Sequence, residues 1–317
     1  MDTTFPKPVS LPGTMPMTSN GQPISAVFHA EDGTSNTPAL DISASEDSYN
    51  MLSSQCARAL IMEGIHAGVL PIPPRFDISP TCADDASATF KLEFRKEDAM
   101  AYSQPQIMLL KIVAPLDPFF RTESEVATLT FLREYGNMPV QTVYHFDSTG
   151  RNSLGLEWML TSTPDGMPLD EHVYNDGRRA IQRPSGCDSI MISSEKLEDV
   201  LRQIEEMVMK LRKLHFHGIG SLYCDWATRT YYIGPLSKWT LSRNRLVLQD
   251  RELVEASHDT DVQSYRLCSG MMHGNLHAGN ILVDSATLKV TCILGLSAVV
   301  IAPLSMLPGA IVLEEEI

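Results

Sequence analysis

The 317-residue sequence has little positive charge and no paired cysteine motif. It contains 25 lysines and arginines against 39 aspartates and glutamates, which gives a formal net charge of −14. Proteins that bind nucleic acids usually carry a basic surface to neutralise phosphates, so this composition argues against nucleic acid as a partner. The six cysteines lack any CxxC spacing, and a chain of this length needs no disulfides to fold. We therefore expect free thiols in a reducing compartment.

The N-terminus lacks the features of a targeting signal. Asp2 and Lys7 do not lead into an apolar run, and neither a secretory signal nor an Arg-rich transit peptide is visible. We therefore expect a cytoplasmic protein. Residues 1–49 mix Pro, Ser, Thr, Gly and Asp with few clustered aliphatic residues. This composition predicts disorder, because the segment cannot bury enough apolar surface to offset its ordering entropy.

Charge is also missing from a long run near the C-terminus, from Val290 to Leu313. The run is long enough to cross a bilayer. However, Pro303, Pro308 and Gly309 would break a membrane helix that has no partner helices to satisfy the freed backbone groups. We therefore expect strand, loop and a short packed tail here and no membrane partner, with a tail-anchored protein as the alternative. Nothing in the sequence indicates an oligomeric state.

The most informative stretch is the segment His273–Asp284, which reads HGNLHAGNILVD. Short polar side chains and two glycines are followed by the β-prone residues Ile281–Val283, a pattern that predicts a polar loop beside a strand. Functional sites are often built at such places. His273 and His277 are four residues apart, the spacing of a zinc pair on a helix. The glycines disfavour a helix, so we prefer the loop interpretation.

This segment resembles the catalytic loop His-Gly-Asp-Leu-His-x-Gly-Asn of the aminoglycoside phosphotransferase and choline kinase group, which has a protein-kinase-like fold. The resemblance implies transfer of a phosphoryl group from ATP, with Mg²⁺, to the hydroxyl of a small-molecule substrate. His273 would brace the loop, Asn275 would occupy the catalytic position, and Asn280 would contact the metal. Where the family has its catalytic aspartate this chain has Asn275, and an amide cannot accept a proton near neutral pH.

A second departure lies in residues 290–297, VTCILGLS, where the family has a strand that ends in Asp-Trp-Glu. Gly295 stands at the position of the metal-holding aspartate and offers no anionic oxygen to Mg²⁺. The segment that corresponds to the phosphate-binding loop, residues 82–88, contains no glycine, and Asp84 and Asp85 would repel phosphate. We therefore expect impaired phosphoryl transfer. The alternative is an inactive pseudokinase that acts as a binding or scaffold module, or a decayed gene product.

The resemblance also assigns residues to the nucleotide. Lys111 would reach the phosphates and pair with Glu125 on the following helix. A different interpretation remains open, because Thr122 to Glu125 fits a capping box in which Glu125 only satisfies the helix N-terminus. The hinge between the lobes, whose backbone would face the adenine, would be formed by Thr161, Ser162 and Thr163. An ordinary turn after a strand explains the hinge composition equally well.

The spacing of apolar residues predicts both strands and helices. Alternation over residues 89–94 and a strand-like run over 107–113 predict an antiparallel hairpin, residues 138–146 a turn into a strand, and residues 154–160 another strand. The clearest helix runs from Ser194 to His215, with one apolar face, acidic residues near its start and basic residues near its end. With the resemblance, this implies an α+β, protein-kinase-like bilobal fold. Its expected parts are a disordered segment 1–49, an N-lobe 50–160 with an antiparallel sheet, and a mostly helical, incomplete C-lobe 161–317.

Overall fold

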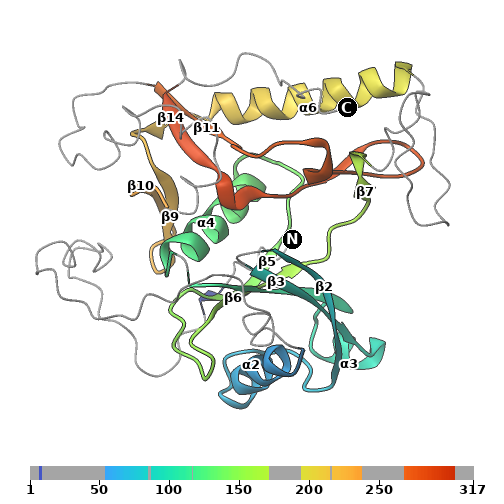
Figure 1. Ribbon diagram of the computed structural model, residues 1–317, viewed down its shortest axis with the longest axis vertical. Coiled ribbons are helices and arrows are strands. Elements are labelled where there is room, and N and C mark those ends of the chain that lie inside the picture. Colours follow the sequence, from blue (N-terminus) through green and yellow to red (C-terminus); the bar gives the residue numbers. More distant parts are fainter. Residues whose placement is uncertain are drawn as a thin grey trace, which may run out of the picture.

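The computed structural model describes residues 7–8, 54–84, 87–115, 117–170, 194–214, 216–237 and 268–303. The segment 1–49, for which the sequence predicts disorder, lies outside the described residues except for Lys7–Pro8, which form strand β1. The end of the uncharged run, residues 304–317, also falls outside it. Figure 1 shows the elements as two groups, with the large sheet and helices α2 and α3 below and helix α6 above.

A six-stranded sheet forms the first group, with strand order β1-β5-β6-β4-β3-β2. All neighbours pair antiparallel except β1, which pairs parallel with β5. The α+β class and the antiparallel N-terminal sheet are thus confirmed. The expected hairpin is also confirmed, since β3 pairs with β4. The strands span Phe76–Asp84 (β2), Ser87–Phe94 (β3), Ile107–Val113 (β4), Val143–Asp147 (β5) and Glu157–Ser162 (β6).

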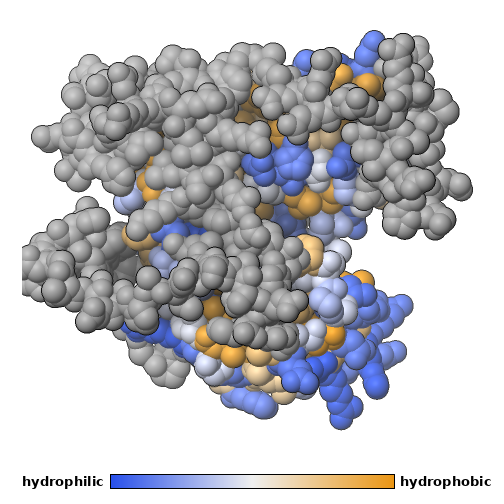
Figure 2. Space-filling model, in the orientation of Figure 1, coloured by the Kyte–Doolittle hydropathy of each residue, from blue (hydrophilic) through white to orange (hydrophobic). Residues whose placement is uncertain are grey.

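One face of this sheet is apolar and is covered by helix α2 (Ser54–His66), below the strands in Figure 1. In β3, the buried residues Phe90 and Leu92 alternate with the partly exposed Lys91 and Glu93. This alternation follows from the two-residue period of a strand. Helix α3 (Lys96–Ala101) joins β3 to β4. Figure 2 shows hydrophilic side chains gathered on the outer surface near β2 and α3, so that edge faces water.

Helix α4 (Phe120–Glu134) connects the two groups. It packs against β5 and β6 on one side and against β9 (Ser221–Asp225) and the 3-10 helix η4 (Leu296–Ala298) on the other. Every residue from Arg121 to Thr130 is buried, although this stretch contains an arginine and two glutamates. Polar and charged side chains on α4 must therefore find partners inside the protein.

The second group contains helix α6 (Ser194–Lys213), which confirms the expected helix to within two residues at its C-terminal end. Its buried residues Val200, Ile204 and Met207 join a core that includes Ile281 and Ile293. Around it lie small sheets, so the expected mostly helical C-lobe is not confirmed by the described residues. The strands are Met167–Pro168 (β7), Phe216–His217 (β8), Ser221–Asp225 (β9), Thr230–Gly234 (β10), Cys268–Met272 (β11), Ile281–Val283 (β12), Val290–Ile293 (β13) and Val300–Pro303 (β14).

The described part of the uncharged run, residues 290–303, contains no long helix. It forms β13, the 3-10 helix η4 (Leu296–Ala298) and β14, which pairs antiparallel with β11. This matches the expected strand and loop. Among the residues that the structure describes, none of the helices has the length and hydropathy needed to cross a bilayer.

Candidate functional site

A cleft of about 510 Å³ lies between the large sheet and the loops of the second group. Strands β2, β3, β4 and β6 and helix α4 form one wall, and the segments 275–280 and 294–298 form the other. Five of the eight residues that the resemblance assigns to catalysis, nucleotide or metal line it together, although they lie far apart in the chain. They are Lys111, Glu125, Thr161, Asn275 and Asn280.

Lys111 and Glu125 form an ion pair in the wall of the cleft. The Lys111 Nζ donates to both carboxylate oxygens of Glu125, at 2.7 and 2.8 Å. The alternation of β4 buries Leu110 and Ile112 against the apolar core and turns Lys111 to the opposite face, toward α4. The capping-box alternative does not hold, because α4 begins at Phe120, its N-cap is Phe119, and no side chain caps it.

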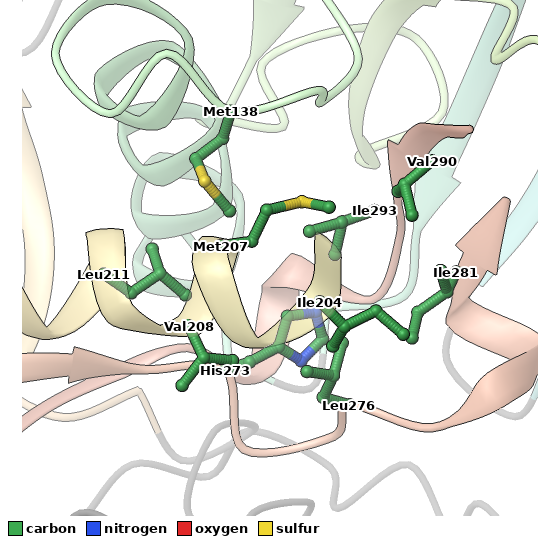
Figure 3. Close-up of a pocket in the computed structure, with 10 residues that line it drawn as sticks. All are labelled: Met138, Ile204, Met207, Val208, Leu211, His273, Leu276, Ile281, Val290 and Ile293. Atoms are coloured by element: carbon green, nitrogen blue, oxygen red, sulfur yellow. The ribbon is translucent and has the colours of Figure 1, made fainter. Parts of the chain in front are cut away.

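His273 braces the polar loop from inside the protein. Its Nε2 lies 2.7 Å from the carbonyl oxygen of Leu294, and its Nδ1 accepts from the backbone N–H of Asn275 at 3.3 Å. Burial lowers the pKa of His273 to about 4, so the ring is neutral at physiological pH. Because Nδ1 accepts, Nε2 carries the proton and donates to Leu294. His273 also borders a small apolar cavity beneath α6, beside Ile204 and Met207 (Figure 3).

Asn280 ties the loop together from its other end. Its Nδ2 donates to the backbone carbonyl of Asn275 at 2.9 Å and lies 2.9 Å from Nε2 of His277. A carbonyl oxygen only accepts, so the amide nitrogen of Asn280, and not its oxygen, must face Asn275. The side chain of Asn275 is exposed in the cleft. The two histidines of the loop are thus held in separate hydrogen bonds rather than side by side on a helix.

Gly295 faces Asn280 across the loop. Its φ of +75° is left-handed, and a β-carbon on it would lie 2.6 Å from Nδ2 of Asn280. Of the described residues that line the cleft, Glu125 alone carries a carboxylate, and both its oxygens accept from Lys111. Magnesium is held in proteins mainly by carboxylates and gives up its water reluctantly. The donors present therefore do not suit Mg²⁺.

The three expected hinge residues are not equivalent. Thr161 lines the cleft and accepts at its Oγ1 from Gln141 Nε2 at 3.1 Å. Gln141 also donates to the carbonyl of Ser162 at 2.9 Å, and the Ser162 hydroxyl accepts from the backbone of Thr142. Thr163 is exposed and is not among the cleft residues. Their proposed contact with adenine stays a prediction.

Several polar residues near the cleft were not singled out from the sequence, among them an arginine, a glutamine and an aspartate. Arg121 lines the cleft one helical turn before Glu125, and the spacing of four on α4 is the signal that would have placed both on one face. Gln141 lines it from the segment before β5. Asp170 lies beside the loop, with Oδ2 3.1 Å from where a β-carbon on Gly279 would be. Within the described residues, Oδ1 of Asp170 is buried without a hydrogen-bond partner.

Two buried glutamates lie behind the cleft wall. Glu123 accepts from Ser148 Oγ at 2.6 Å and from Trp226 Nε1 at 2.8 Å, which links α4 to both groups of elements. Burial raises the pKa of Glu123 to about 7, against the opposing effect of these two hydrogen bonds. Glu157 accepts from the backbone N–H of Phe119 at 2.6 Å, and burial raises its pKa to about 7 as well. Both carboxyl groups therefore change charge near neutral pH.

Comparison with known proteins finds similarity to two kinds of protein. No protein-family model matches the chain. Curated relatives from two strains of Aspergillus fumigatus, each called a subtelomeric hrmA-associated cluster protein, are 28% identical over 127 residues. The match covers 37% of this chain, and the chain spans only 22% of the length of these relatives.

Solved structures to which the chain is similar include aminoglycoside phosphotransferases. The APH(3'')-Id enzyme of Streptomyces rimosus is 18% identical, with a TM-score of 0.39, and the match covers 80% of this chain and 77% of that one. An aminoglycoside-3'-phosphotransferase of type VIII is 17% identical, with a TM-score of 0.38, and the match covers 72% and 73%. A candidate aminoglycoside phosphotransferase of Ralstonia eutropha is 13% identical, with a TM-score of 0.40, and the match covers 72% of this chain and 60% of that one.

Proposed function

We propose that this chain is a phosphotransferase-like nucleotide-binding protein whose phosphoryl transfer to small-molecule hydroxyls is strongly impaired or lost. The observation that carries the proposal is the Lys111–Glu125 ion pair in a cleft that also contains Asn275 and Asn280. In kinases such a lysine–glutamate pair positions the lysine on the nucleotide phosphates. The volume of about 510 Å³ falls within the range of small-molecule and cofactor sites.

The proposed impairment of phosphoryl transfer follows from the residue types at the catalytic position, Asn275, and at the metal position, Gly295. Asn275 is exposed to the cleft where a general base is needed, and its amide cannot take the proton of a substrate hydroxyl. General-base catalysis is typically worth about 10²- to 10⁴-fold in rate. Gly295 adds the loss of a metal carboxylate. Together these changes favour a binding or scaffold role over an efficient enzyme.

The test is an assay of the purified chain with ATP, magnesium and a panel of aminoglycosides, choline and other amino alcohols. We expect nucleotide binding that Lys111→Met weakens, with turnover absent or near the background rate. Lys91→Met is a matched control, because Lys91 lies on the neighbouring strand β3 and pairs with Glu93 outside the cleft. Robust turnover that depends on Lys111 would overturn the impaired assignment. Nucleotide binding that is indifferent to Lys111→Met would place the site elsewhere.

The rival proposal is a scaffold that binds no nucleotide at all. The buried link from Glu123 to Trp226 and Ser148 gives such a scaffold a physical basis, because it holds the two groups of elements together without any ligand. Calorimetry with ATP separates the two proposals. A complete absence of binding would favour the scaffold.

A further inference from the structure

The lysine and the arginine of the cleft lie on one wall, together with Glu125 and neutral polar residues, whereas the loop wall carries His277 and neutral groups. Asn275, Asn280 and Ser297 supply amides and a hydroxyl on the loop wall, where Gly295 supplies nothing. Both oxygens of the Glu125 carboxylate accept hydrogen bonds from Lys111. A magnesium–nucleotide complex would therefore meet no anionic protein ligand among the described cleft residues.

The opposite wall carries a second cation. Arg121 lies one turn before Glu125 on α4 and is only 2% exposed, yet it borders the cleft. A guanidinium presents several donors in a fixed plane and binds phosphate oxygens in pairs, which an ammonium cannot do. Glu157 is an acidic group whose charge interacts with that of Arg121, and it also accepts from the backbone N–H of Phe119 at 2.6 Å.

We propose that the cleft binds the phosphates of a nucleotide free of divalent cation, with Lys111 and Arg121 neutralising the charge that Mg²⁺ would otherwise neutralise. This inference rests on the proposed function, since it needs a nucleotide in the cleft. An uncomplexed nucleotide carries more negative charge than its magnesium complex, so two cations attract it more strongly. Magnesium then competes with the protein for the phosphates instead of bridging them.

The first experiment compares metal-free and metal-bound nucleotide on the full chain. ATP is titrated calorimetrically in excess EDTA and in excess magnesium, and adenosine serves as a probe without phosphates. We expect ATP to bind at least as tightly in EDTA as in magnesium, and more tightly than adenosine. Binding of ATP only in magnesium would overturn the inference and leave the proposed function standing. If Asp170→Asn abolished that magnesium-dependent binding, the metal would be assigned to Asp170.

A failure of the proposed function gives a different result. In that case neither ATP nor adenosine would bind in EDTA or in magnesium. The two failures are thus distinguishable in one set of titrations.

The second experiment tests Arg121. Arg121→Gln should weaken ATP binding in EDTA about tenfold, the effect of one lost charge-assisted hydrogen bond, and leave adenosine binding unchanged. Arg121→Lys, which keeps the charge, should retain part of the affinity. Arg133→Gln is the matched control, because Arg133 is an exposed arginine on the same helix and outside the cleft. Wild-type affinity for ATP after Arg121→Gln would overturn the role of Arg121.

Arg121 is buried, so its replacement can also destabilise the fold. The salt dependence of ligand binding to the wild-type chain tests, without any variant, whether phosphate charge contributes to binding. Screening by salt should weaken ATP binding and leave adenosine binding nearly constant. Equal salt dependence of the two ligands would show that phosphate charge does not determine binding and would overturn the inference.

Discussion

The Lys111 ammonium contacts both carboxylate oxygens of Glu125, at 2.7 and 2.8 Å, between strand β4 and helix α4. The side chains are 21% and 9% exposed, so the pair is largely shielded from water. By contrast, Lys91 and Glu93 pair at 2.8 Å with side chains 40% and 42% exposed. The chain thus provides a shielded ion pair and an exposed one whose lysines lie on adjacent strands.

We predict that Lys111→Met lowers the free energy of unfolding by about 1 to 3 kcal/mol, because Glu125 is left as a shielded charge without its partner. Lys91→Met should change it by less than about 1 kcal/mol, since exposed pairs contribute little. Urea denaturation of both variants measures the difference. The double variant Lys111→Met, Glu125→Gln should recover part of the loss. Equal effects of the two single variants would contradict a shielded pair.

Alanine substitutions at Gly295 and Gly155 distinguish the cost of backbone strain from the cost of a side-chain collision. Both have positive φ, at +75° and +66°, but a β-carbon on Gly155 meets nothing within 4 Å. Gly155→Ala should therefore cost about 1 to 2 kcal/mol of strain alone. Gly295→Ala should cost more, because its β-carbon would collide with Nδ2 of Asn280. Adding Asn280→Ala should remove the excess, and thermal or urea unfolding that shows no excess would contradict this contact.

The raised pKa of Glu123 predicts that the stability of the fold depends on pH. Its pKa is raised from 4.5 to about 7 in the folded protein, mainly by burial, so the folded state holds this proton more tightly than the unfolded state. The resulting stabilisation is complete below about pH 4.5 and is lost as the pH rises through about 7, an effect of about 3 kcal/mol. Glu123→Gln removes this titration. Relative to wild type, the variant should gain most of that amount between pH 5 and pH 8.

The matched control for this titration is Glu205→Gln, at an exposed position of α6. Its stability should follow the wild-type pH profile. Trp226 donates to Glu123 at 2.8 Å, so its fluorescence gives a local readout of the same proton. A Glu123→Gln variant whose stability keeps the wild-type pH dependence would show that Glu123 is ionised throughout this range.

Restoring two carboxylates should restore metal dependence. Asp tolerates left-handed backbone better than most residues, so Gly295→Asp is less strained than Gly295→Ala once Asn280 rotates away. With Asn275→Asp, the loop gains two carboxylates in the cleft wall. We predict that magnesium then raises ATP affinity about tenfold or more over EDTA, as measured by calorimetry. The single variant Asn275→Asp is the control, and an unchanged response to magnesium in the double variant would contradict the prediction.

Much of the local structure was predictable from the sequence. Alternating residues predicted strands β3 and β4, and the apolar face of residues 194–215 predicted α6, because strand and helix periods are local properties. The expectation of a mostly helical second half is not confirmed by the described residues. Its small sheets join short segments far apart in sequence, such as β8 with β11, and a two-residue strand has no period to detect.

The sequence by itself determined the chemistry available at the loop. Asn275 and Gly295 lack carboxylates whatever the fold, because the capacity to accept a proton or hold a metal belongs to the side chain. Only the tertiary structure decided which side chains meet. It paired Glu125 with Lys111 rather than with its own helix terminus, and placed Arg121 on the cleft. These contacts depend on how α4 packs between the two groups of elements, which no local pattern specifies.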